Sequence, residues 1–71
     1  MPDMKPVNSS NLSAVGYEAQ MMQLYVRFRS GALYVYYDVP VRIYEGLMKA
    51  SSHGKYHDAF IKNAYRYKRL F

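Results

Sequence analysis

The chain has 71 residues, no cysteine and a net charge of +5 at pH 7, which excludes disulfides and predicts one small domain. It has no apolar signal segment at its start and no apolar run approaching the ~20 residues of a membrane span, so we predict a soluble, cytoplasmic protein. All the excess positive charge lies after residue 48. This asymmetry favours anionic partners, nucleic acid first and a membrane surface second, although a solvated basic face is the competing interpretation.

Residues 1–6 contain two prolines and no periodic pattern, so we predict a flexible leader outside the fold. The domain is expected to cover residues 7–68, with 69–71 as its C-terminal end. After a polar turn at 8–11, residues 12–18 are typical of an imperfect strand. Gly16 within that strand suggests a bulge or close packing.

Residues 22–29 alternate apolar and polar side chains with a period of two, which predicts a half-buried strand. Its even-numbered residues are expected to face inward and its odd-numbered ones outward. Ser30-Gly31 follows, and Gly31 can adopt the positive φ that a tight hairpin needs. The next strand ends before Asp38.

The register of this hairpin decides where its tyrosines point. A two-residue loop pairs Val26 with Val35 and turns Tyr34 and Tyr36 outward, whereas a three-residue loop at 30–32 pairs Val26 with Tyr36 and turns both tyrosines inward. The apolar pattern favours the first register.

Pro40 is suited to a first helical turn, and apolar residues spaced three or four apart predict a helix over about 40–50. Gly54 is expected to end it. A second, shorter helix is predicted with Asp58 as its N-cap, and residues 65–71 fit a helical tail, an extra strand or a frayed end. The expected fold is α+β, a three-stranded antiparallel meander followed by two helices packed on one sheet face.

Several short motifs, with their order and spacing, closely resemble those of the KTSC domain, a small domain at the C terminus of some lysyl-tRNA synthetases and in stand-alone bacterial proteins. The resemblance covers about residues 7–68. It implies no established activity, only RNA binding suggested by the synthetase context. His57-Asp58 departs from the Phe-Asn that members often have, which puts a packing role for His57 in doubt. The motifs are Ser9-Ser10-Asn11-Leu12, Ala14-Val15-Gly16-Tyr17, Leu24-x-Val26-x-Phe28, Ser30-Gly31, Tyr34-Val35-Tyr36, Val39-Pro40, Tyr44-x-x-Leu47 and Ser52-x-Gly54-x-Tyr56.

Two groups of residues are candidates for binding RNA. The hairpin can form a stacking platform with a cationic partner, or its aromatics can simply pack across strands. The C-terminal bases can contact phosphates, or they can form a solvated face. The first group is Tyr25, Arg27, Tyr34 and Tyr36, and the second is Lys55, Lys62, Arg66, Lys68 and Arg69.

His53 and His57 have the spacing of two metal ligands on one helix, but Gly54 lies between them and no third ligand is evident. A general acid–base pair for RNA cleavage is the other use of these histidines. We predict neither a metal site nor a catalytic pair at these histidines, so we expect no cofactor and no enzymatic activity. The leading hypothesis is a small non-catalytic module that binds RNA, in particular tRNA-like RNA; the alternative is a protein-interaction or homodimer module using an aromatic sheet face or edge strand.

Overall fold

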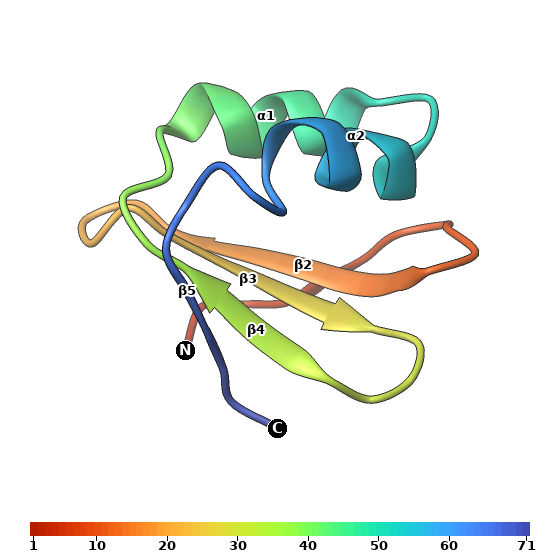
Figure 1. Cartoon of the computed structure of the whole chain (residues 1–71), viewed down its shortest axis with the longest axis horizontal. Helices are drawn as coiled ribbons and strands as arrows, with labels where there is room; N and C mark the ends of the chain where they lie inside the picture. Colours follow the sequence, from red (N-terminus) through yellow and green to blue (C-terminus); the bar gives the residue numbers. More distant parts are fainter.

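The computed structural model describes residues 1–71 as one antiparallel sheet with two helices on one side of it (Figure 1). The α+β class and the helices on one sheet face agree with the prediction. The predicted three strands are wrong, because the sheet has five, which lie side by side in chain order. The elements are β1 (Lys5–Pro6), β2 (Leu12–Glu18), β3 (Gln23–Phe28), β4 (Leu33–Tyr36), α1 (Val41–Lys49), α2 (His53–Phe60) and β5 (Tyr67–Arg69).

The two additional strands lie at the edges of the sheet. Residues 5 and 6, which the sequence analysis assigned to a leader outside the fold, pair with β2, with Lys5 opposite Val15. At the other edge β5 pairs with β4, with Tyr67 opposite Tyr36. Of the three conformations considered for residues 65–71, the chain therefore adopts the strand.

The main core lies between the sheet and the helices. Leu24 and Val26 of β3 and Val15 of β2 are completely buried, as the alternation of β3 predicts. Leu47 of α1 and Ile61, just after α2, cover them from the helical side. Each such buried aliphatic side chain stabilises the fold by about 1.5–3 kcal/mol.

The opposite face of the sheet is partly covered. Leu33 and Val35 of β4 point to this face and are buried. The N-terminal segment crosses the same face, since a Cβ built on Gly16 would lie only 2.7 Å from Met4 Sδ and 2.9 Å from the carbonyl oxygen of Asp3. Gly16 thus provides the close packing that the sequence suggested.

The β3–β4 hairpin has a register that differs from both predicted ones. Gly31 N–H donates to the carbonyl of Phe28, and Phe28 N–H donates to the carbonyl of Ala32. The loop is therefore residues 29–31, and Val26 lies opposite Tyr34. Gly31 has φ 97°, as expected for the left-handed residue that ends a three-residue loop.

The favoured pairing of Val26 with Val35 is therefore wrong. Because the observed register differs by two residues from the pairing of Val26 with Tyr36, it gives the same alternation of faces. Tyr34 and Tyr36 consequently lie on the helix side of the sheet. Gly31 ends the observed loop, whereas the predicted three-residue loop at 30–32 would have placed it at the centre.

The first helix is slightly shorter than predicted, and the second begins earlier, so the two lie closer together in sequence. Helix α1 begins after Pro40, but α2 begins after Ser52, whose Oγ accepts from Lys55 N–H at 3.3 Å. The predicted N-cap at Asp58 and helix end at Gly54 are wrong. Both residues lie inside α2, because the Ser52 cap starts the helix six residues earlier. Neither helix is long and apolar enough to cross a membrane.

Candidate functional site

A pocket of about 410 Å³ opens between the β3–β4 hairpin, β5 and the second half of α2. Its apolar part, here called the aromatic pocket, is formed by Phe28, Tyr34, Tyr36, Tyr67 and His57. The ring of Tyr34 lies 5.5 Å from that of Phe28 and 5.6 Å from that of Tyr67, measured between centroids. Pairing of β5 with β4 places Tyr67 beside Tyr36, at 5.9 Å. The volume is within the range of roughly 300–1,000 Å³ typical of ligand sites.

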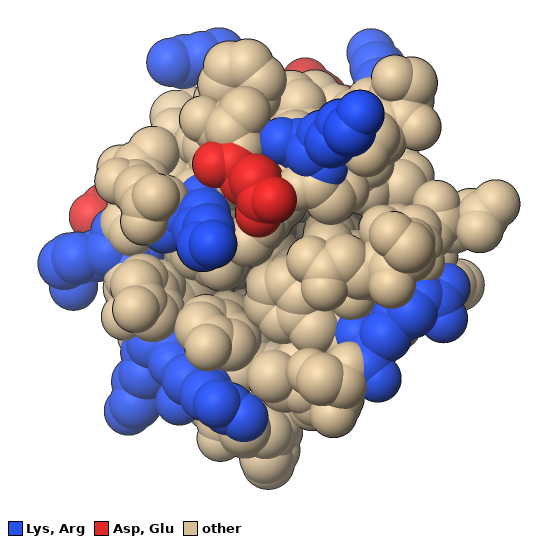
Figure 2. Space-filling view, turned by 45° about the vertical axis from the view of Figure 1, so that its right-hand side comes forward, with Lys and Arg blue, Asp and Glu red and all other residues tan.

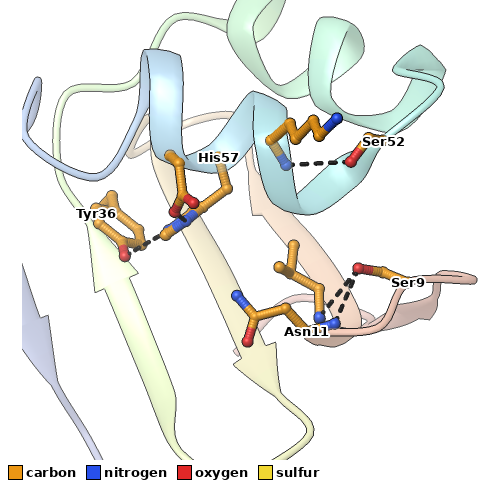
Figure 3. Close-up of polar contacts among 8 residues, drawn as sticks. Ser9, Asn11, Tyr36, Ser52 and His57 are labelled. Carbon is orange, nitrogen blue, oxygen red and sulfur yellow. Dashed lines mark hydrogen bonds and ion pairs between the residues drawn. The ribbon is translucent and has the colours of Figure 1, made fainter.

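The base of the pocket contains a hydrogen bond between two buried side chains. The hydroxyl of Tyr36 lies 2.8 Å from Nε2 of His57, and each residue is only 3% exposed (Figure 3). Burial, with smaller contributions from Tyr34 and Tyr67, raises the pKa of Tyr36 to about 12. Tyr36 therefore remains a neutral hydroxyl that can donate to the imidazole.

His57 is a packing residue as well as a polar one. Its ring contacts that of Phe28 edge-on at 5.3 Å and that of Tyr36 at 5.5 Å. The doubt raised about a packing role at this position was therefore misplaced. An imidazole can pack at this buried position because the Tyr36 hydroxyl satisfies its Nε2 atom.

The other ring nitrogen of His57 faces a carboxylate. Nδ1 is buried and lies 3.5 Å from Oδ1 of Asp58, too far for a well-formed hydrogen bond, and it has no other partner. Burial lowers the pKa of His57, and the nearby Asp58 carboxylate opposes this effect. With the imidazole neutral, the tautomer carrying its proton on Nδ1 points that proton at Asp58 and leaves Nε2 to accept from Tyr36.

Two cations and two amides lie at the mouth of the aromatic pocket. Lys62 and Arg69 line it. Lys62 forms no ion pair, whereas Nε of Arg69 donates to the main-chain oxygen of Phe71. Asn11 and Asn63 also line it, and their side-chain amides make no hydrogen bond within the protein. Figure 2 shows Lys and Arg as separate groups around one face of the molecule, with acidic atoms between them, rather than as one continuous stripe. The pocket mouth thus offers positive charge, unpaired at Lys62, and free amide groups beside aromatic rings.

Four of the nine predicted RNA-binding residues meet in this pocket: Tyr34, Tyr36, Lys62 and Arg69. Tyr36 is buried beneath the others, so Tyr34 and the unpredicted Tyr67, which is 57% exposed, present the accessible ring surface.

Four other predicted residues lie elsewhere. Tyr25 and Arg27 point to the opposite sheet face, because they pair with Val35 and Leu33. Lys68 pairs with Val35 and also points there. Arg66 forms an exposed ion pair with Asp38 at 3.4 Å and lies over the ring of Tyr37.

The remaining predicted residue, Lys55, lines a second cavity that contains no hydrophobic residue. We call it the polar cavity. Figure 3 shows Asn11 between the Tyr36–His57 pair and Ser9 and Ser52, two of the four serines that line this cavity. The two cavities share Asn11 and Asp58 in their walls.

The two histidines do lie on one continuous helix, although Gly54 between them made this doubtful from the sequence. They form hydrogen bonds to different elements. Nδ1 of His53 donates to the carbonyl of Leu47 at 2.8 Å and so caps the end of α1. His57 is bonded to Tyr36. Each imidazole therefore fastens α2 to a different element.

Phe28, His57, Asn11, Asn63 and Tyr67 are pocket residues that the sequence did not identify as such. The Tyr36–His57 contact joins residues 21 positions apart, and Tyr67 reaches the pocket only through β5. The mixed aromatic and basic pattern of residues 65–69 was a signal for the region, but no local pattern specifies the strand that β5 joins.

Comparisons with known proteins agree with this architecture. The family model of the KTSC domain matches residues 8–65. A crystal structure of a KTSC domain protein from Yersinia pestis superposes with a TM-score of 0.96 at 30% identity, covering all of both chains.

Relatives occur both as small proteins and within larger ones. A protein from Tsukamurella paurometabola is 38% identical over 63 residues, which cover 89% of this chain and 94% of that one. A lysine–tRNA ligase from a Nostoc species is also 38% identical, over 97% of this chain but only 12% of the ligase. Because the family model spans most of the chain and the fold is the same throughout, the chain belongs to the KTSC domain family.

Proposed function

We propose that this protein is a small non-catalytic module that binds RNA by taking an unpaired nucleotide into the aromatic pocket. The observation that carries the proposal is the position of Lys62, which forms no ion pair, and of Arg69, which bonds only the main-chain oxygen of Phe71, beside the half-buried ring of Tyr34 and the exposed ring of Tyr67. Stacking on a ring and a cation for the neighbouring phosphate are the two elements of single-strand binding.

The ring geometry supports stacking on one side only. The centroids of Tyr34 and Tyr67 are 5.6 Å apart, within the roughly 4.5–7 Å of a direct aromatic pair. A base cannot therefore be inserted between them and stacks on their exposed surface instead. Such binding tolerates different bases, and the free amides of Asn11 and Asn63 are the groups available to contact base edges.

Two observations favour RNA as the partner: the distribution of charge along the chain and the identity of some related proteins. The excess positive charge lies in the C-terminal third of the chain, which includes Lys62 and Arg69. Three related proteins are lysine–tRNA ligases, enzymes named for a tRNA substrate. We extend that partner class, as a proposal, to this chain.

Fluorescence anisotropy with labelled single-stranded RNA and tRNA, across a salt series, tests the proposal. Tyr67→Ala should weaken binding by the roughly 1–3 kcal/mol of one stacked base. Lys62→Ala and Arg69→Ala should each weaken binding and reduce the slope of log K against log salt by about 0.7.

Lys68→Ala is the matched control, since it removes the same charge from the opposite face of β5. It should leave the salt slope closer to that of the unchanged protein than Lys62→Ala does. Absence of binding at low ionic strength, or equal effects of Lys62→Ala and Lys68→Ala, would contradict the proposal.

Self-association is the second candidate, supported by the open edge of β5 and by the exposed side chains of Leu70 and Phe71 next to it. The bases of β5 oppose the pairing of two copies by charge repulsion. Sedimentation equilibrium at low and high salt separates the cases: a dimer strengthened by salt supports this candidate, and a monomer throughout rejects it.

A further inference from the structure

The polar cavity has about the same volume as the aromatic pocket, about 410 Å³, and adjoins it. The two share Asn11 and Asp58, so a ligand that fills one can continue into the other across these side chains. No hydrophobic residue lines the polar cavity. Its occupant must therefore be polar throughout.

The hydroxyl groups of this cavity are oriented by the backbone. Ser9 Oγ accepts from the N–H groups of Asn11 and Leu12, each at 3.2 Å, and Ser52 Oγ accepts from Lys55 N–H at 3.3 Å (Figure 3). In these bonds the serine oxygens act as acceptors, so their own hydrogens stay free to donate. The cavity thus offers fixed hydroxyl donors to the oxygens of a ligand.

The cavity also has one free cation. Lys55 is exposed and is not within ion-pair distance of any carboxylate. The one acidic group in the wall, Asp58, lies at the boundary with the aromatic pocket, where it faces His57. A carboxylate accepts hydrogen bonds, which a ribose hydroxyl can give and a phosphate diester cannot. The donors and Lys55 suit phosphate oxygens, and Asp58 suits a sugar hydroxyl.

We propose that the polar cavity is a second subsite, which takes the ribose–phosphate of the nucleotide that adjoins the one whose base is held in the aromatic pocket. This inference rests on the proposed function. The smallest ligand that uses the whole site is then a dinucleotide carrying a terminal phosphate, with one base stacked near Tyr67 and one phosphate near Lys55.

An NMR titration of the full chain with AMP and with the RNA dinucleotide pApA tests this subsite. In the unchanged protein we expect pApA to bind about tenfold more tightly than AMP, as one further charge-assisted contact allows. We also expect pApA alone to shift the amide signals of Ser9 and Lys55. Lys55→Ala should bring the two affinities close together without changing that of AMP, and Lys68→Ala, the matched control, should leave the ratio unchanged.

The two proposals fail in different ways. Equal affinities for AMP and pApA in the unchanged protein, with signals of Tyr34 and Tyr67 still responding to both, would overturn the second subsite alone. An affinity ratio insensitive to Lys55→Ala would do the same. Absence of any response to AMP, pApA or longer RNA would overturn the proposed function and the subsite with it.

Discussion

Tyr36 and His57 are joined by a hydrogen bond of 2.8 Å that links β4 to α2 inside the protein. Both side chains are almost fully buried, so neither can exchange this bond for one to bulk water. The bond therefore fastens the helical layer to the sheet directly beneath the aromatic pocket. Its consequences for stability can be measured.

Tyr36→Phe should lower the free energy of unfolding by about 1–3 kcal/mol, because it leaves Nε2 of His57 buried without a partner. Urea denaturation followed by circular dichroism measures this. Tyr25→Phe is the control: it removes a hydroxyl bonded to Gln23 at the half-buried surface of the opposite face, and should cost much less. Equal decreases in the free energy of unfolding for the two variants would show that burial does not make the Tyr36 hydrogen bond more important for stability.

The free energy of unfolding should decrease as the pH is lowered, because His57 is buried in the folded state. Burial lowers its pKa in the folded state, while the unfolded chain keeps a value near 6.5. As pH falls through about 6.5 the unfolded state takes up the proton first, so the free energy of unfolding decreases until the folded-state pKa is passed. Urea denaturation between pH 4.5 and 8 measures this decrease.

His57→Gln removes the titrating group while keeping a polar side chain near Tyr36. The difference in unfolding free energy between the original protein and this variant should shrink as the pH is lowered through 6.5. A difference that stays constant with pH would mean that His57 does not contribute to the pH dependence.

Gly46 of α1 should resist substitution, although it lies inside a helix. A Cβ at this position would overlap the side chain of Tyr56 on α2. Gly46→Ala should therefore destabilise the protein by about 1–3 kcal/mol, despite a helix-propensity gain of about 1 kcal/mol.

A double-mutant cycle isolates this contact. In a Tyr56→Ala background the overlap is absent, so adding Gly46→Ala should instead stabilise the protein, by up to about 1 kcal/mol. Thermal and urea unfolding of the four proteins give the coupling energy. The same effect of Gly46→Ala in both backgrounds would rule out the overlap as its cause.

Gly31→Ala should destabilise the hairpin by about 1–2 kcal/mol, the cost of placing an ordinary residue in the left-handed region. The cause is backbone conformation alone, since no atom lies within 4 Å of a Cβ built there. Gly31→Asn should cost less, because asparagine tolerates positive φ. Unfolding experiments that rank the two variants equally, or asparagine as the worse, would contradict this explanation.

The sequence predicted elements with strong internal patterns and missed those that depend on partners. The alternation in residues 22–29 was sufficient to predict β3 and its buried residues Leu24 and Val26. Strand β1 has two residues and β5 three, all exposed, so neither shows the alternation of buried and exposed side chains that predicts a strand. They are strands only because β2 and β4 offer free edges.

Only part of the site was predicted, because its assembly also depends on pairing between strands. The basic residues Lys62 and Arg69 and the hairpin residues Tyr34 and Tyr36 were chosen separately, and the pairing of β4 with β5 brings them together. Alternation alone could not decide which face the tyrosines occupy. The role of His57 depends on a hydroxyl 21 positions away, which no local pattern indicates.

The three-residue hairpin loop has a consequence for the evolution and engineering of this domain. Lengthening or shortening residues 29–31 by one would exchange the two faces of β4, moving Leu33 and Val35 beneath the helices and Tyr34 and Tyr36 to the other side. Side chains in the loop can vary widely as long as Gly31 keeps its conformation, but the number of residues cannot vary freely. When relatives are compared or the pocket is transplanted, loop length is therefore the first property to match.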